Sequence, residues 1–303
     1  MSDESFAEKH TVHTEAQQHE AVAAEVAALP EEQPLVPAAA SMHRGGAPLA
    51  GTQALAAAAV QDGGLVPSRH PTYRLAFTVP WLGRNFPSWF PYFLASCGRS
   101  AFLVDWLIFH EDAALPDASE IPPNVIFHNL GKGGLGMLFG MKISQALGQT
   151  AGMSRLVQLF QLAFTEFSYI VTEYKPTHGI VFAEYLRAYS HWSYTDIDLI
   201  SGDLPLHIEL SELRDYDIFT YHFGDVFRLY LRGQFAAHRN APNVNMIWAQ
   251  CPHLGSGLIR ELQAKHEIVK RLAAEGKRGR TRFISAEGCY SWAVASATGM
   301  RAR

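Results

Sequence analysis

Short apolar segments separated by polar or glycine-rich stretches begin abruptly at Tyr73 and continue through most of the remaining chain. Short segments rich in β-branched and aromatic residues predict strands, and longer ones with apolar positions three or four apart predict helices. The expected strands are 73–79, 104–109, 125–127, 192–200 and 217–221. The expected helices are 87–97, 135–147, 156–167, 180–189, 206–213 and 259–271.

The alternation of strands with helices predicts an α/β fold, Rossmann-like, with a mostly parallel sheet flanked by helices. Ligands of such sheets bind beyond the carboxyl ends of the strands. The first strands are followed by polar or special residues there: Pro80-Trp81, His110-Glu111-Asp112 and Gly202-Asp203. We therefore expect one cleft to gather them.

Residues 1–70 have a different composition from the rest of the chain. They are rich in Ala, Glu, Gln, His and Pro, and Phe6 is their only aromatic residue. Such a segment buries too little apolar surface to offset the entropy lost on ordering. The sequence therefore predicts a disordered tail over 1–70 and a globular domain over 71–303.

Composition narrows the classes of function. The chain has 303 residues, of which 48% are hydrophobic, enough for a sizeable core. Its formal net charge of -4 supplies no basic field and argues against nucleic acid as a partner.

Cellular location has to be inferred from weak signals. The three cysteines show no Cys-x-x-Cys spacing, which indicates neither a zinc site nor a disulfide framework and favours a reducing compartment. No apolar run reaches the ~20 residues of a membrane span, and the acidic N-terminus is unlike a signal peptide. The expectation is a cytoplasmic protein, or a Golgi-associated one if the N-terminus is incomplete.

Asp196 and Asp198 are the most informative pair. On an extended backbone, residues two apart share one face, so their carboxylates are expected to form a seat for Mg²⁺ or Mn²⁺. They lie among apolar and aromatic residues, where an uncompensated carboxylate is costly. The alternative is a structural pair that caps a turn. A second pair, Asp215 and Asp217, serves as an internal comparison because its context is that of a helix end and strand start.

Three further residues are candidates for chemistry. Lys175 is placed to hold a donor phosphate as a point charge, and a surface loop before a helix explains its segment equally well. Glu287 and Asp225 are candidates for the base that deprotonates an acceptor hydroxyl. For Glu287, next to a glycine, the sequence alone favours an ordinary loop carboxylate. The stretch 228–234 alternates charge and bulk, which is typical of a half-exposed strand.

Several motifs, taken in order, resemble a little-characterised family of polysaccharide-synthesis glycosyltransferases. The resemblance covers about Tyr73 to Trp292 and is much more specific than a lone Asp-x-Asp pair. The matching segments are 76–81, 93–97, 106–109, 174–179, 195–203, 231–240 and 285–290.

The resemblance implies a GT-A type fold and a metal-dependent glycosyltransferase that moves a sugar from a nucleotide-sugar to a glycan or other hydroxyl acceptor. By that analogy Asp196 and Asp198 hold Mn²⁺ or Mg²⁺ on the donor diphosphate, and Asp196 also contacts the ribose. Thr78 and Pro80 would lie beside the nucleotide base. Lys175 would approach the donor.

Two departures from the family pattern leave a second function open. Glu173 stands where an aspartate is expected, and the chain stops soon after Trp292, so a C-terminal histidine that often completes metal binding is expected to be missing. The alternative is a non-catalytic protein that binds a nucleotide-sugar or carbohydrate with a degenerate glycosyltransferase fold.

Overall fold

The structure, a computed structural model, describes residues 69–221, 229–276 and 286–303. The chain divides into two units, Met1–Gly64 and Leu65–Arg303, and all described residues belong to the second. The tail predicted over 1–70 therefore lies outside the described residues, apart from its last two positions.

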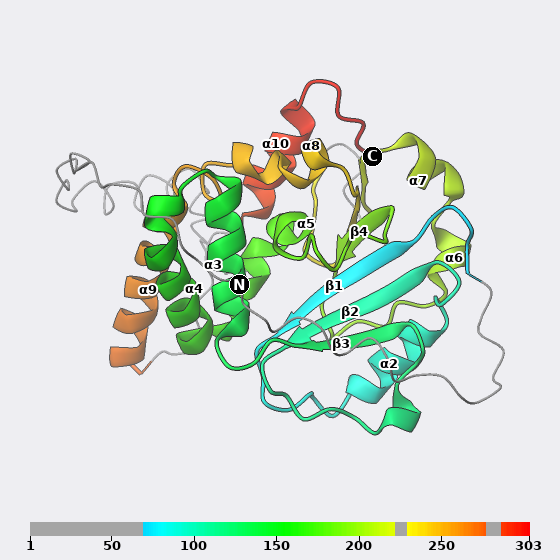
Figure 1. Cartoon of the computed structure of the whole chain (residues 1–303), viewed down its shortest axis with the longest axis horizontal. Helices are drawn as coiled ribbons and strands as arrows, with labels where there is room; N and C mark the ends of the chain where they lie inside the picture. The colour runs from blue at the N-terminus through cyan, green and yellow to red at the C-terminus, as the bar shows by residue number, and fades with distance from the viewer. Residues whose placement is uncertain (1–68, 222–228, 277–285) are drawn as a thin grey trace, which may run out of the picture. The chain divides into compact units, whose positions relative to one another are not determined.

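A six-stranded sheet in the order β3-β2-β1-β4-β6-β5 forms the centre of the described part of the chain (Figure 1). Strands β3, β2, β1 and β4 run parallel, and β6 is antiparallel to both of its neighbours. This confirms the predicted mixed, mostly parallel sheet. The strands are β1 (Leu75–Trp81), β2 (Val104–His110), β3 (Val125–Asn129), β4 (His191–Tyr194), β5 (Ile218–Phe219) and β6 (Ala236–Arg239).

Helices flank the sheet. The α-helices are α2 (Phe90–Gly98), α3 (Gly134–Ala146), α4 (Met153–Glu166), α5 (His178–Val181), α6 (Leu204–His207), α7 (Leu210–Asp215), α8 (Pro242–Asn245), α9 (Leu258–Ala274) and α10 (Glu287–Ser296). The 3₁₀ segments are η1 (Ala118–Glu120), η2 (Thr150–Gly152), η3 (Ser168–Thr177) and η4 (Ile247–Gln250). None of the helices in the described residues is long and apolar enough to cross a membrane.

Successive side chains of a strand point to opposite faces of the sheet, and those on each face belong to a separate hydrophobic core. In β1, Ala76 belongs to one core, whereas Leu75 and Phe77 belong to the other. Because successive strand side chains point to opposite faces, a strand covered on both sides is apolar at nearly every position. The first core lies under α3, α4, η3 and α10, and the second lies under α2 and α7.

Two glycines bring α3 against α4, and α4 in turn packs against α9 (Figure 1). A Cβ atom at Gly136 would lie 2.7 Å from the backbone of Gln161, and one at Gly140 would lie 2.5 Å from the Cα atom of Val157. Side chains at these positions would push the helices apart.

Several elements differ from the prediction. The strand expected over 192–200 ends at Tyr194, because its pairing with β1 and with β6 stops there. The helix expected over 180–189 is mostly turns after the short α5. The helix expected over 206–213 is two short helices, α6 and α7. Of the stretch 228–234, which is typical of a half-exposed strand, residue 228 lies outside the described residues and 229–234 are not a strand; β6 follows them. Helix α10 begins at Glu287, where the sequence favours a loop.

Candidate functional site

The order of the strands reverses beside β1. From β1 the chain passes to β2 and then to β3 on one side, whereas β4 lies on the other side of β1. Ligands of α/β sheets bind outside the carboxyl ends of the strands at such a reversal. Thr78 of β1 is paired with Tyr194 of β4, so Pro80 and Asp196 each follow that pair by two residues. Both predicted site residues thus lie at this reversal, where the fold leads us to expect a crevice.

Asp196 forms an ion pair with Lys175. The Nζ atom of Lys175 lies 2.5 Å from Oδ1 of Asp196, and the side chains are 5% and 30% exposed. The same ammonium group donates a hydrogen bond of 2.7 Å to the carbonyl oxygen of Gly233. It also lies 5.9 Å from the ring centroid of Tyr194. Lys175 is therefore held in the site, which excludes the surface-loop interpretation of its side chain.

Gly233 joins Lys175 to Glu287. Its backbone N–H donates to Oε1 of Glu287 at 2.6 Å, and the hydroxyl of Tyr230 donates to Oε2 at 3.1 Å. A Cβ atom at position 233 would lie 2.9 Å from Oε1 of Glu287 and 3.2 Å from Nζ of Lys175. The structure therefore brings together three predicted residues, Lys175, Asp196 and Glu287, around a glycine that the prediction missed. A glycine inside an apparent strand pattern indicates close approach of another group, and this was the available signal.

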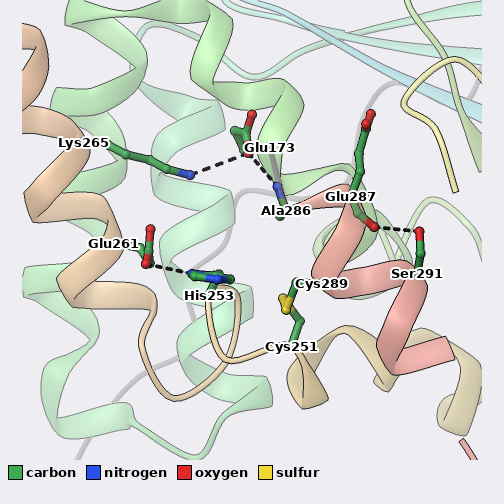
Figure 2. The surroundings of a disulfide bond; sticks show 9 residues. All are labelled: Glu173, Cys251, His253, Glu261, Lys265, Ala286, Glu287, Cys289 and Ser291. Carbon is green, nitrogen blue, oxygen red and sulfur yellow. Dashed lines mark hydrogen bonds and ion pairs between the residues drawn. A yellow bond between two sulfur atoms is a disulfide. The ribbon is translucent and has the colours of Figure 1, made fainter. Parts of the chain in front are cut away.

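Glu287 is the first residue of α10, and three contacts fix this end of the helix (Figure 2). Oε2 of Glu173 accepts the backbone N–H of Ala286 at 3.0 Å. The hydroxyl of Ser291 donates to the carbonyl oxygen of Glu287 at 2.6 Å and accepts the N–H of Leu231 at 2.8 Å. The third contact is the disulfide bond at Cys289.

The disulfide joins Cys251 to Cys289 and closes a sequence separation of 38 residues. The inference that the cysteines form no disulfide is therefore wrong: folding brings their Cα atoms to 5.5 Å, a distance suited to a disulfide that sequence spacing did not reveal. Cys97 is free and buried.

Glu173 contacts α9 and the start of α10. It is 10% exposed and lies 3.6 Å from the Nζ atom of Lys265 on α9. Burial raises the pKa of its carboxyl group, and the charge of Lys265 partly offsets this rise. Glu173 thus connects η3, α9 and the start of α10.

Asp198 is exposed and lies in a turn, and the described residues give it no ion-pair or hydrogen-bond partner. Because β4 ends at Tyr194, the argument that an extended backbone places both aspartates on one face does not hold. Among residues 69–221, 229–276 and 286–303, no three His, Cys, Asp or Glu side chains gather to hold an ion by themselves. A metal at the aspartate pair would need further ligands from a bound molecule and water.

Thr78 is fully buried below the crevice. Its hydroxyl donates to the carbonyl oxygen of Ser193 at 2.9 Å, so it accepts from Nδ1 of His178 at 2.8 Å. Burial, helped by the nearby charge of Lys175, holds the pKa of His178 well below its usual range. Thr78 and His178 therefore form a neutral support beneath the ion pair. Pro80, at the end of β1, is partly buried. Asp225 lies outside the described residues.

Glu111, one of the polar residues that follow β2, caps a helix, whereas we expected it to line a cleft. The carboxylate of Glu111 accepts the N–H groups of Gly133 and Leu135, both at 2.9 Å. It thereby caps the start of α3, where an exposed helix end would attract a phosphate. In the glycine-rich loop before α3, the N–H groups of Gly131, Gly133 and Gly134 donate to groups of the chain itself.

Comparison with known proteins assigns a family. A family model described as a family of unknown function, DUF6625, matches residues 77–269, which is more than half of the chain. The match includes Lys175, Asp196 and Gly233 but ends before Glu287. A search of curated proteins gave no match. The chain therefore belongs to the DUF6625 family of unknown function.

Proposed function

We propose that this chain is a glycosyltransferase that moves a sugar from a nucleotide-sugar donor to a hydroxyl of a glycan or other acceptor. The observation that carries the proposal is the meeting of Asp196, Lys175 and Glu287 around Gly233, with Asp196 at the reversal of strand order beside β1. An ammonium group and carboxylates at this place suit the two demands of the reaction, which are a charged diphosphate leaving group and a proton to be removed. The strand order, with one antiparallel strand, is in keeping with the GT-A type fold.

Asp196 and Asp198 would hold the divalent cation, Mn²⁺ or Mg²⁺. The donor set fits such an ion, since Mg²⁺ in proteins is typically bound by one or two carboxylates together with substrate phosphates and water. Asp198 is exposed and Asp196 is partly exposed, so both are open to an ion that arrives with a diphosphate. When bound, this ion supplies positive charge to the leaving diphosphate.

Lys175 would act on the donor phosphate, and Glu287 would act on the acceptor hydroxyl. A lysine ammonium has three N–H donors, and within the described residues Lys175 uses two of them, on Asp196 and Gly233. The third is available to a donor phosphate. When the acceptor oxygen bonds to the anomeric carbon and the bond from that carbon to the diphosphate oxygen breaks, the hydroxyl proton would pass to Glu287. Asp225 remains a second candidate for this base, and Thr78 and Pro80 remain predictions for the side of the nucleotide base.

The disulfide bears on cellular location. Disulfides persist in oxidising compartments and are rare in the reducing cytosol. Of the two expected locations, the Cys251–Cys289 bond favours the Golgi-associated one over the cytoplasm. We propose an oxidising compartment as the place where the protein acts.

The test combines binding with turnover. A thermal-shift screen of nucleotide-sugars with and without Mn²⁺ identifies the donor, and release of the nucleoside diphosphate measures turnover. The Asp196→Asn variant should lose turnover by about 100-fold, because it removes charge that holds the cation. Asp215→Asn is the matched control, since Asp215 belongs to the other Asp-x-Asp pair and its carboxylate accepts hydrogen bonds from the exposed Arg214. Equal turnover in both variants would overturn the mechanism.

A second candidate, a non-catalytic binder of nucleotide-sugars, is favoured by one observation. Lys175 already compensates the charge of Asp196 without a metal. Donor binding that is indifferent to Mn²⁺, with no release of nucleoside diphosphate by the wild-type chain, would select this function.

A further inference from the structure

We propose that the Cys251–Cys289 disulfide is a redox-sensitive clamp on Glu287 and, through the backbone of Gly233, on Lys175, so that a dithiol reductant which opens it weakens binding of the donor. The part of this inference that concerns donor binding rests on the proposed function. The clamp itself can be measured without a ligand. The clamp would restrict full binding to an oxidising compartment.

Position is the first argument. Cys289 lies in the first turn of α10, two residues after Glu287, and Cys251 directly follows η4 (Figure 2). The bond therefore fastens the turn of α10 that carries the site carboxylate, and no other part of the helix. Glu173 holds the same turn from the opposite direction through the N–H of Ala286.

The remainder of α10 has its own anchors, so opening the clamp should act locally. Tyr290 is fully buried, and its hydroxyl lies 2.8 Å from Nε2 of His238 on β6. Ser291 accepts the N–H of Leu231. These contacts do not involve the disulfide and keep the helix docked when the bond is broken. The first turn would retain only the contacts of Ala286 and Glu287.

The exposure of the cysteines and the chemistry of thiol–disulfide exchange both suit reduction of this bond by a dithiol. Cys251 is buried, whereas Cys289 is half-buried beside the exposed Gly288, so we propose the sulfur of Cys289 as the one that a reductant attacks. A thiolate of the dithiol attacks this sulfur, and the second thiol then resolves the mixed disulfide. The dithiol loses two electrons and becomes a disulfide, and Cys251 and Cys289 gain two electrons and two protons as thiols.

The experiment compares the oxidised full-length chain with the chain treated with dithiothreitol and with the Cys251→Ser/Cys289→Ser variant. Hydrogen exchange reports the clamp through the amide of Gly233, which donates to Glu287. We expect this amide to exchange about 10-fold faster in the reduced chain and in the variant, with β1 and β4 unchanged. Binding of UDP or GDP with Mn²⁺ should weaken about 10-fold in the same samples.

Dithiothreitol added to the double variant is the matched control. It should change nothing further, because the only remaining cysteine is the buried Cys97. Equal exchange at Gly233 in oxidised and reduced chains overturns the clamp, as does alkylation of both Cys251 and Cys289 without prior reduction. Faster exchange with no nucleotide binding in either state supports the clamp and overturns the proposed function.

Discussion

Gly233 is the residue on which the site depends most directly, because both of its backbone polar groups are used by site side chains. We predict that Gly233→Ala lowers donor turnover by at least about 10-fold, since its methyl group would displace Glu287 or Lys175. Gly288→Ala is the control: a Cβ atom there meets nothing within 4 Å, and alanine favours the helix. Steady-state release of nucleoside diphosphate measures both variants. Normal turnover in Gly233→Ala would show that Glu287 and Lys175 need not hold this geometry.

The Lys175–Asp196 ion pair differs from surface pairs by the burial of its lysine. A double-mutant cycle with Lys175→Met and Asp196→Asn should give a coupling free energy of about 1–3 kcal/mol in urea unfolding, because either single change leaves a poorly solvated charge. The Lys142–Glu184 pair is the control, since its N–O distance of 2.6 Å is nearly the same while its side chains are 24% and 59% exposed. Its coupling should stay below about 1 kcal/mol. Equal coupling in the two cycles would contradict the role of burial.

At the scale of elements, His253 connects the segment after η4 to the first turn of α9 (Figure 2). Its hydrogen bond to Glu261 raises the pKa of His253 above its usual value. The pair therefore stabilises the fold fully below about pH 6.5, the unfolded pKa, and the contribution is lost as pH rises through the folded pKa. Because His253 is 38% exposed, the effect should be below about 1 kcal/mol.

Urea unfolding between pH 5.5 and 8.5 tests this pair. The difference in stability between wild type and His253→Gln should shrink as pH rises. A constant difference across this range would mean that the His253–Glu261 contact does not depend on protonation.

At the scale of the molecule, the sequence was sufficient for most of the sheet but not for the site. Strands β1 and β2 are apolar on both faces and were predicted nearly to their ends. The strand predicted over 192–200 was too long, because Ile197, Leu199 and Ile200 are still apolar after the pairing with β1 and β6 has stopped. Where a ladder ends is decided by neighbouring strands, which local composition does not encode.

The meeting of Lys175, Asp196 and Glu287 had one weak local signal, the glycine at position 233, which does not reveal which groups approach it. Each residue was a candidate alone. Lys175 contacts Asp196 directly, but its link to Glu287 passes through the backbone of Gly233, and Glu287 reaches that glycine from a helix that small residues concealed. The disulfide was missed for the same reason, since its cysteines are 38 residues apart. Candidate residue types were predictable, and their convergence was a property of the fold.

Two buried histidines on the neighbouring strands β4 and β6 should contribute to how the molecule responds to acid. His191 on β4 and His238 on β6 are 1% and 0% exposed. Burial lowers the pKa of His191 to about 4 and that of His238 to about 3. Above pH 6.5 both are neutral in the folded and unfolded states. Below it the unfolded chain binds protons that the folded chain refuses, so stability falls until the pH reaches the folded pKa values.

The expected loss from each histidine is about 1.4 kcal/mol per pH unit below 6.5, or roughly 2 kcal/mol at pH 5. Urea unfolding of wild type and His191→Gln between pH 7.5 and 4.5 isolates one of them: the variant should start less stable, because it alters a packed core position, and should lose stability less steeply with acid. Parallel slopes for wild type and His191→Gln would show that the folded protein protonates His191 as readily as the unfolded chain does, and the sheet would then have to admit a charge between β1 and β6.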